Sequence, residues 1–381
     1  MAYFDNAATS FPKPETVYES MDQFNRNTSG SFGRGNYGTT GRVKGLAEET
    51  RSNIKLLLQC ASKQVIFEPT ATISLNIIIQ GVIEKGVRTV YISPFEHNAV
   101  TRTLHHYVVA GKIKVLQLAI QKDYKYDLQR IQYQFENDAP DFVIVSHASN
   151  VIGLVAPIAQ ICEMAKQFNA VTLVDMAQTA GLIDCNIGSE IFDFAVFAGH
   201  KTLLGPTGIS GFVMKPDFSL PAVMFGGTGF ESANQDMPMS LPERFEFGTM
   251  NGVGVAGLCA STKWILERGI DYVYSKESTN RKRLLELLSS YDFVTIVGNH
   301  SGNQYVGIVS CIMDGVSSDM AGQLFAERNV AVRTGLHCAP LAHQQLSTYP
   351  AGTIRFSVSC LTGDEDFTTL EAALDDIRDN L

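Results

Sequence analysis

A lysine and a carboxylate follow two short apolar segments in the middle of the chain. Asp175 ends the apolar run 171–175, and Lys201 stands four residues after the end of the apolar run 194–197. If both runs are strands of one parallel sheet, both side chains lie at its carboxyl edge, where open α/β sheets bind ligands. Pyridoxal phosphate requires such a pair, because a lysine forms its Schiff base and a carboxylate keeps its pyridinium nitrogen protonated. A salt bridge that caps the sheet accounts for the two residues equally well.

Further polar residues stand close behind predicted strands. Gln178 comes three residues after Asp175, His97 and Asn150 follow two other apolar runs, and His200 directly precedes the lysine. Taken singly, Asn150 is typical of a turn, and the two histidines are as typical of a surface loop or a strand end. Together they predict polar side chains gathered at one edge of a sheet.

The elements that must position these residues alternate between short apolar runs and helical patterns. Such alternation predicts an α/β fold in which a mostly parallel, seven-stranded sheet is covered by helices on both faces. Helices are expected at 73–83 and 157–168, with Pro157 in the first turn of the second. The expected strands are 64–68, 89–92, 114–118, 142–146, 171–175, 194–197 and 209–214.

The pattern changes after about residue 246. Helices are expected at 253–267 and 275–290, followed by strands at 293–297, 305–312, 330–333 and 353–358 and a last helix at 364–379. We therefore expect a large domain formed by residues 15–245 and a smaller C-terminal α/β domain formed by residues 246–381. Residues 1–14 are expected to pack with the small domain.

Composition and charge exclude several classes of protein. The chain has 381 residues, 45% hydrophobic and 18% charged, which is enough to bury a full core. Its 30 Lys+Arg against 39 Asp+Glu give a net charge of −9, whereas nucleic-acid binding depends on basic residues. The sequence shows no signal-peptide pattern, and no apolar stretch approaches the roughly 20 residues of a membrane span. We expect a cytoplasmic protein that binds neither nucleic acid nor membrane.

Two G-x-G-x-x-G motifs occur, at 33–38 and 252–257. A dinucleotide-binding motif needs a strand before its glycines and an acidic residue at the end of the next strand. The first motif follows a polar, turn-like stretch and is interpreted as a loop. The second opens a helix without a suitable acidic strand end, so its helix N-terminus could receive only a phosphate.

The seven cysteines contain no C-x-x-C pair, which argues against a zinc knuckle, any other metal site of that type and a disulfide framework. Six are interpreted as small buried hydrophobes. Cys338 differs, because it lies in Arg333-Thr334-Gly335-Leu336-His337-Cys338, where positive charge from Arg333 and His337 would favour a thiolate. Arg355 stands within an apolar strand and needs a partner, either a substrate carboxylate or an acidic side chain.

With these motifs in order, the sequence resembles the class V aminotransferase family of fold type I pyridoxal-phosphate enzymes, and within it the group II cysteine desulfurases and selenocysteine lyases. The resemblance extends from Tyr3-Phe4-Asp5-Asn6-Ala7-Ala8-Thr9 to Arg355. It implies that residues 15–245 bind pyridoxal 5'-phosphate, that Lys201 is the Schiff-base lysine and that Asp175 pairs with the pyridinium nitrogen.

The same resemblance assigns the remaining cofactor contacts. Gln178 would contact the ring hydroxyl, His97 would stack on the ring and act in catalysis, and Asn150 would lie beside cofactor and substrate. Ala71, Thr72 and His200 would hold the phosphate. This chain has Thr70-Ala71-Thr72-Ile73 where the family usually has Gly-Ala/Thr-Thr-Glu, and Thr70 would restrict a backbone that needs a positive φ.

Residues outside the large domain complete the implied site. Thr249, in Glu246-Phe247-Gly248-Thr249, matches a threonine that reaches the phosphate of the partner subunit and implies a homodimer; an ordinary helix N-cap is the simpler role. Arg355 and Ala8 would contact the substrate, together with Asn150. Cys338 would accept the sulfur.

The resemblance thus implies a cysteine desulfurase that converts L-cysteine to L-alanine and stores the sulfur on Cys338 as a persulfide, for delivery to a sulfur-acceptor protein. A selenocysteine lyase acting on L-selenocysteine would use the same residues. An aminotransferase or another β-eliminating lyase on this fold would leave Cys338 without a role. A protein that only binds partners would lack cofactor on Lys201.

Overall fold

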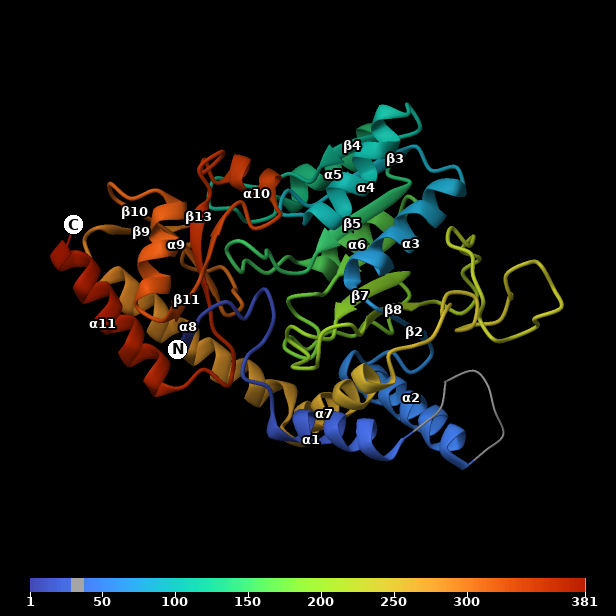
Figure 1. The fold of residues 1–381 in the computed structure, drawn as a ribbon. Coiled ribbons are helices and arrows are strands. Elements are labelled where there is room, and N and C mark those ends of the chain that lie inside the picture. Colours follow the sequence, from blue (N-terminus) through green and yellow to red (C-terminus); the bar gives the residue numbers. More distant parts are fainter. Residues whose placement is uncertain (29–37, 381) are drawn as a thin grey trace.

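A seven-stranded sheet forms the larger of two α/β units in a computed structural model that describes residues 1–28 and 38–380 (Figure 1). The strand order is β2-β8-β7-β6-β5-β3-β4, and β8 alone runs antiparallel to both of its neighbours in this sheet. The predicted mostly parallel, seven-stranded sheet is therefore confirmed. Its strands are β2 (Gln64–Glu68), β3 (Thr89–Ile92), β4 (Lys114–Gln117), β5 (Phe142–Ser146), β6 (Val171–Asp175), β7 (Phe194–Ala198) and β8 (Ser210–Met214).

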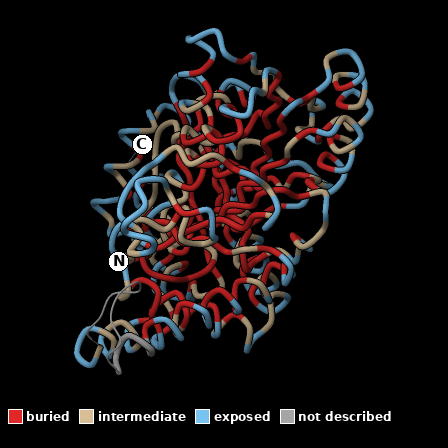
Figure 2. Tube along the Cα trace, turned by 90° about the vertical axis from the view of Figure 1, so that its right-hand side faces the viewer, coloured by how far each residue is buried: buried red, intermediate tan, exposed pale blue. Residues whose placement is uncertain are grey.

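Helices cover both faces of this sheet, which is why its central strands are buried on both sides. One face packs on α3 (Ala71–Glu84) and α4 (Asn98–Val109), through side chains such as Ile78 and Leu104. The opposite face packs on α2 (Gly38–Leu57), α5 (Leu128–Asn137), α6 (Ile158–Lys166) and α7 (Gly252–Arg268). Buried residues gather in the middle of the molecule (Figure 2), and the two faces of this sheet belong to two separate hydrophobic clusters.

The smaller unit is built on a four-stranded antiparallel sheet of order β12-β13-β10-β9. Its core holds Phe325, Phe356 and one face of the last helix, with Phe367, Leu370 and Leu374 buried as the sequence pattern predicts. Its elements are β9 (Val294–Val297), β10 (Ile308–Met313), β12 (Arg333–Gly335), β13 (Thr353–Ser357), α9 (Ser318–Glu327), α10 (Pro340–Gln345) and α11 (Asp364–Asn380).

The N-terminal segment joins this smaller unit. Strand β1 (Ala2–Tyr3) pairs in parallel with β11 (Val330–Ala331), and Phe4 is buried in the core of the small unit. Because β11 pairs with β1 whereas β12 pairs with β13, the expected single strand 330–333 is divided into two strands of different sheets. The expectation of one strand is wrong, because a change of pairing partner leaves no mark on the local apolar pattern.

Two helices connect the units. Helix α7 lies against α1 (Glu15–Asn27) and α2, and its buried side chains, such as Val255 and Leu258, belong to the core of the large sheet (Figure 1). By packing, α7 therefore lies with the large unit although it follows residue 245. Helix α8 (Ile270–Ser289) contributes Val273 to the large core and Leu284 to the small one.

The glycines of the second G-x-G-x-x-G motif serve the packing of α7. A Cβ on Gly257 would lie 2.8 Å from the Pro206 ring, and one on Gly254 would lie 2.5 Å from Asn251. Asn251 itself caps the helix by accepting from the Gly254 N–H at 3.0 Å. The first motif falls outside the described residues except for Gly38, which begins α2.

Other helix boundaries differ from expectation by a few residues. Helix α6 begins at Ile158, so Pro157 occupies the N-cap position instead of the first turn. No described helix, within residues 1–28 and 38–380, is long and apolar enough to cross a membrane.

Candidate active site

The sequence-predicted lysine and carboxylate lie at the carboxyl edge of adjacent strands of the large sheet. Asp175 is the last residue of β6 and pairs in register with Val196 of β7, and Lys201 follows three residues after β7 ends. Continuous apolar residues form these two strands. Gly199 follows β7, and only glycine fits there because a Cβ would lie 2.3 Å from the Ile209 carbonyl oxygen.

The surroundings of Lys201 favour its neutral amine. The pKa of Lys201 is lowered to about 8, mainly by burial; the charge of Asp175 opposes this shift, and the charges of Arg355 and Arg333 add to it. Among the described residues its amino group forms no ion pair. A lysine that is partly neutral near pH 8 can act as a nucleophile and as a base.

Burial also raises the pKa of two carboxyl groups, Asp175 and Glu96. Burial raises the pKa of Asp175, against the opposing effects of the Ala177 backbone N–H and of Lys201. Glu96 is fully buried and accepts the backbone N–H and the hydroxyl of Ser146, at 2.6 and 2.8 Å. Burial, with the charge of Asp175, raises the pKa of Glu96 to about 8, so Glu96 is mostly protonated at neutral pH. Sequence reasoning missed Glu96, although it directly precedes His97.

His97 is the N-cap of α4. Its Nδ1 accepts the Ala99 backbone N–H at 3.0 Å and thereby caps the helix. Burial, followed by the charges of Lys201 and Arg333, lowers the pKa of His97 to about 4. The ring is therefore neutral at pH 7 and presents Nε2–H on the side away from the helix.

Gln178 and Lys201 line one small cavity together with Ala7. The Gln178 Nε2 donates to the Ala7 carbonyl oxygen at 2.9 Å, which ties the N-terminal segment to the end of the large sheet. Ala8, the expected substrate contact, is partly exposed. It lies in a tight turn in which its backbone N–H donates a hydrogen bond to the Asp5 carbonyl oxygen.

The expected phosphate residues Ala71 and Thr72 form the first turn of α3. Thr70 caps this helix with φ −146°, and its hydroxyl accepts the Ile73 N–H at 3.2 Å. A positive φ is therefore not needed at Thr70, and its departure from the family pattern causes no backbone strain. Thr72 is exposed at a helix N-terminus, an arrangement that suits an anion.

Arg355 has an acidic side chain as a partner, which is one of the two alternatives that the sequence left open. In this structure its Nη2 donates to Asp5 at 2.8 Å and its Nη1 donates to the Asn150 carbonyl oxygen at 2.9 Å. Its Nε–H is buried and has no partner among the described residues. Asp5 lies 350 residues away in sequence, and sequence reasoning missed it although it belongs to the N-terminal motif.

Cys338 lies in a loop whose backbone adopts left-handed conformations. His337 and Cys338 have φ of 47° and 56°, and the Cys338 carbonyl oxygen accepts the Asn98 N–H at 2.7 Å. The Arg333 guanidinium donates to the Cys338 sulfur at 3.6 Å. Non-glycine residues rarely adopt a positive φ, and strained backbone of this kind is concentrated at functional sites.

His337 does not supply the positive charge that its position in the sequence suggested. Its ring is buried, and its Nε2 bonds to the Thr353 hydroxyl at 2.9 Å. Burial, with the charges of Arg355 and His343, lowers the pKa of His337 to about 2, so the ring is neutral. The backbone carbonyl of His337 instead accepts from the Asn150 side chain at 2.7 Å.

The expectation of six buried cysteines is only partly correct. Cys60, Cys162, Cys259 and Cys311 are buried, whereas Cys185 and Cys360 are partly exposed, as Cys338 is. These two pack against the large core, and burial raises their pKa to about 11 and about 12. Among the described cysteines, only Cys338 lines the larger cavity described next.

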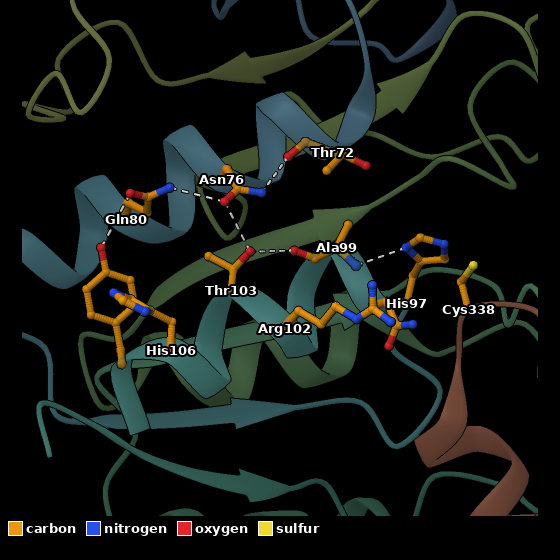
Figure 3. A pocket seen from close by; sticks show the side chains of 11 residues that line it. Thr72, Asn76, Gln80, His97, Ala99, Arg102, Thr103, His106 and Cys338 are labelled. Carbon is orange, nitrogen blue, oxygen red and sulfur yellow. Dashed lines mark hydrogen bonds between the residues drawn. The ribbon is translucent and has the colours of Figure 1, made fainter. Parts of the chain in front are cut away.

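The larger cavity has a volume of about 480 Å³ and lies between α3, α4 and the Cys338 loop (Figure 3). Thr72, His97 and Cys338 line it, so three sequence-predicted site residues from distant parts of the chain meet there. His97 and the Cys338 sulfur lie side by side at one end (Figure 3).

Thr249 lies elsewhere. It is exposed and lines neither of these two cavities. It is also not the N-cap of α7, because Asn251 has that role.

A large, mostly parallel sheet with a lysine and a carboxylate at its carboxyl edge, joined to a small α/β unit, defines the fold type I class of pyridoxal-phosphate enzymes. The sequence matches the aminotransferase class-V family over residues 2–370, and the chain belongs to this family. Enzymes of the family generally depend on pyridoxal phosphate.

Proteins described as cysteine desulfurases are similar to this chain over at least 90% of their length. The "Probable cysteine desulfurase" of Pyrococcus abyssi (strain GE5 / Orsay) is 28% identical over 393 residues, covering 100% of this chain and 94% of the relative. The "Cysteine desulfurase" of Haloferax volcanii is 25% identical over 388 residues, covering 100% and 90%. The apo structure of the cysteine desulfurase from Thermococcus onnurineus NA1 superposes with a TM-score of 0.91 at 25% identity, covering 100% of this chain and 95% of that one.

The polar groups at the edge of the large sheet fit pyridoxal phosphate. The amino group of Lys201 and the carboxylate of Asp175 form no ion pair with described residues, and His200 Nδ1 is buried without a hydrogen-bond partner. The amine of Lys201 suits the aldehyde of the cofactor, and the carboxylate of Asp175 suits its cationic ring nitrogen. The Nδ1 of His200 can bind an oxygen of its phosphate.

Proposed function

We propose that this chain is a cysteine desulfurase that holds pyridoxal phosphate on Lys201 and takes sulfur from L-cysteine onto Cys338. The observation that carries the proposal is the position of the Cys338 thiol, which lines the larger cavity together with His97 and Thr72. The names of the relatives described above agree with this assignment.

The cofactor would be held by residues from several strand ends. Lys201 would form the covalent link, Asp175 would face the ring nitrogen, Gln178 the ring hydroxyl, and His97 the ring face. Ala71, Thr72 and His200 would contact the phosphate. When bound, pyridoxal phosphate withdraws electrons from the substrate Cα, which makes its proton removable.

The chain's own residues supply the remaining steps. Arg355, whose Nε–H lacks a partner, would bind the substrate carboxylate with Asn150 and Ala8 beside it. The neutral amine of Lys201 would remove the Cα proton. The Cys338 thiolate would then form a bond to the substrate sulfur as the Cβ–S bond breaks, and Cβ would gain a proton to give alanine.

We also propose a homodimer in which Thr249 reaches the phosphate site of the partner subunit. The exposure of Thr249, at a distance from both cavities of its own chain, supports this role. Replacing Thr249 by Ala should weaken cofactor binding without changing the fold of the chain, which equilibrium dialysis against pyridoxal phosphate would measure.

The test of the proposed reaction compares Cys338→Ala with Cys360→Ala, which removes a partly exposed cysteine outside the cavity. We expect Cys338→Ala to keep the bound cofactor but to stop sulfide release from L-cysteine in the presence of a reducing thiol. Cys360→Ala should retain release. Undiminished release by Cys338→Ala would contradict the role of Cys338. If Cys338→Ala still releases selenide from L-selenocysteine at the wild-type rate, the runner-up, a selenocysteine lyase, is the better description.

A further inference from the structure

The larger cavity extends well beyond the residues that the proposed reaction uses. From Cys338 and His97 it continues along the facing sides of α3 and α4 (Figure 3). Its volume of about 480 Å³ lies within the range of small-molecule sites. The residues that line this extension are Asn76, Gln80, Arg102, Thr103, His106 and Tyr107.

A chain of hydrogen bonds fixes the polar wall of this extension. The Asn76 side chain donates to the Thr72 carbonyl oxygen at 2.9 Å, and Gln80 donates to Asn76 at 3.1 Å. Thr103 donates to the same Asn76 oxygen at 3.2 Å, which links α4 to α3. The wall is therefore arranged before any ligand binds, as in other sites with positioned polar groups (Figure 3).

The described side chains that line this cavity include a positive charge and no negative one, whereas the chain as a whole is acidic. No Asp or Glu is among its described lining residues, although the whole sequence has 39 acidic against 30 basic residues. Arg102 lines it, and its guanidinium points toward the end where His97 and Cys338 lie (Figure 3). Within residues 1–28 and 38–380, the Arg102 side chain forms no ion pair, and its charge acts on His97. An unpaired arginine beside a cavity is a binding group for a carboxylate.

We infer that this cavity binds a small thiol carrying a carboxylate, which takes the sulfur from Cys338. The inference rests on the proposed function and adds the chemical class of the acceptor. Arg102 binds the acceptor's carboxylate, and this places the acceptor's sulfur near Cys338. The acceptor thiolate attacks the outer sulfur of the Cys338 persulfide. A new S–S bond forms on the acceptor, the S–S bond to Cys338 breaks, and its electron pair returns to the Cys338 thiolate, so no other oxidant or reductant is required.

The experiment uses the pyridoxal-phosphate-loaded enzyme and two thiols of similar size, 3-mercaptopropionate and the neutral 2-mercaptoethanol. After loading with L-cysteine, the rate at which each thiol removes the sulfur from Cys338 is followed by peptide mass spectrometry. We expect Arg102→Gln to reduce the preference for the anionic thiol by about fivefold, the effect of one charge at about 4 Å in water. Because the site is exposed, this preference should also fall with added salt.

The matched control is Arg130→Gln, which removes an exposed arginine of α5 outside the cavity and should leave the preference unchanged. A second measurement does not need turnover: the ratio of Cys338 alkylation by iodoacetate to that by the neutral iodoacetamide should fall in Arg102→Gln only. An unchanged ratio of anionic to neutral reagents in Arg102→Gln overturns the inference. The inference is also overturned if Arg102→Gln changes the oligomeric state while the ratio of anionic to neutral reagents stays the same. In that case a second copy of the chain or a protein acceptor would occupy the cavity. If Cys338 gains no sulfur from L-cysteine but the alkylation ratio falls, the proposed function fails and the anion site stands.

Discussion

The low pKa of Lys201 has a measurable consequence in the cofactor-free enzyme. With a pKa of about 8, the amine is about 10% neutral at pH 7 and about 90% neutral at pH 9. An exposed lysine would be only about 3% neutral even at pH 9. The reactivity of Lys201 toward a neutral acylating reagent should therefore rise about tenfold between pH 7 and pH 9 and then level off.

The assay is competitive labelling of the cofactor-free enzyme with a trace of acetic anhydride, resolved by peptide mass spectrometry, with the exposed Lys282 as an internal reference. The variant Asp175→Asn tests the direction in which the charge of Asp175 shifts the pKa of Lys201. The charge of Asp175 raises the pKa of Lys201, so its removal should move the labelling midpoint to lower pH. A wild-type midpoint near pH 10, or a midpoint that rises in Asp175→Asn, would refute the reasoning.

Three further outcomes follow from contacts around the site. Asp5→Asn should lower the free energy of unfolding by roughly 2 kcal/mol in urea, because it leaves the buried Arg355 charge without its ion pair; an unchanged midpoint would contradict this. Lys63→Met should cost roughly 3 kcal/mol in the same measurement, since Lys63 donates to three backbone carbonyls and is 2% exposed; a loss below about 1 kcal/mol would show that water replaces these bonds. In the cofactor-free enzyme, nitrogen-15 NMR should show a neutral His97 ring from pH 8 down to about pH 5, because burial lowers its pKa to about 4; titration near pH 6.5 would be the opposite result.

The fold was predictable because its determinants are local. Strands such as Phe142–Ser146 are unbroken apolar runs that a sheet covered on both faces requires, and their bounds agree with the sequence to within a residue. The division of 330–333 between β11 and β12 was not predictable, because it depends on pairing with β1 and β13 from distant parts of the chain. The apolar pattern of the sequence indicates a strand, but it does not indicate the strand with which it pairs.

In the candidate site, too, the features set by local sequence were predictable and those set by long-range packing were not. The positions of Lys201 and Asp175 were predictable because Asp175 ends one apolar strand, Lys201 lies three residues beyond another, and parallel strands share a carboxyl edge. The pairing of Asp5 with Arg355 was not, since the two are brought together only by the packing of the N-terminal segment on the small unit. His337 shows the reverse error: it adjoins Cys338 in sequence, but the left-handed backbone at 337 and 338 turns its ring toward Thr353.

The central claim, that Cys338 receives the sulfur of L-cysteine, is tested most directly by a single turnover. The cofactor-loaded enzyme is mixed with less than one equivalent of L-cysteine, and alanine and the mass of each cysteine-containing peptide are measured together. We predict equal amounts of alanine and of added sulfur, with all of that sulfur on the peptide that contains Cys338. Alanine without sulfur on Cys338, sulfur on Cys185 or Cys360 instead, or transfer of the amino group to a keto acid would contradict the account.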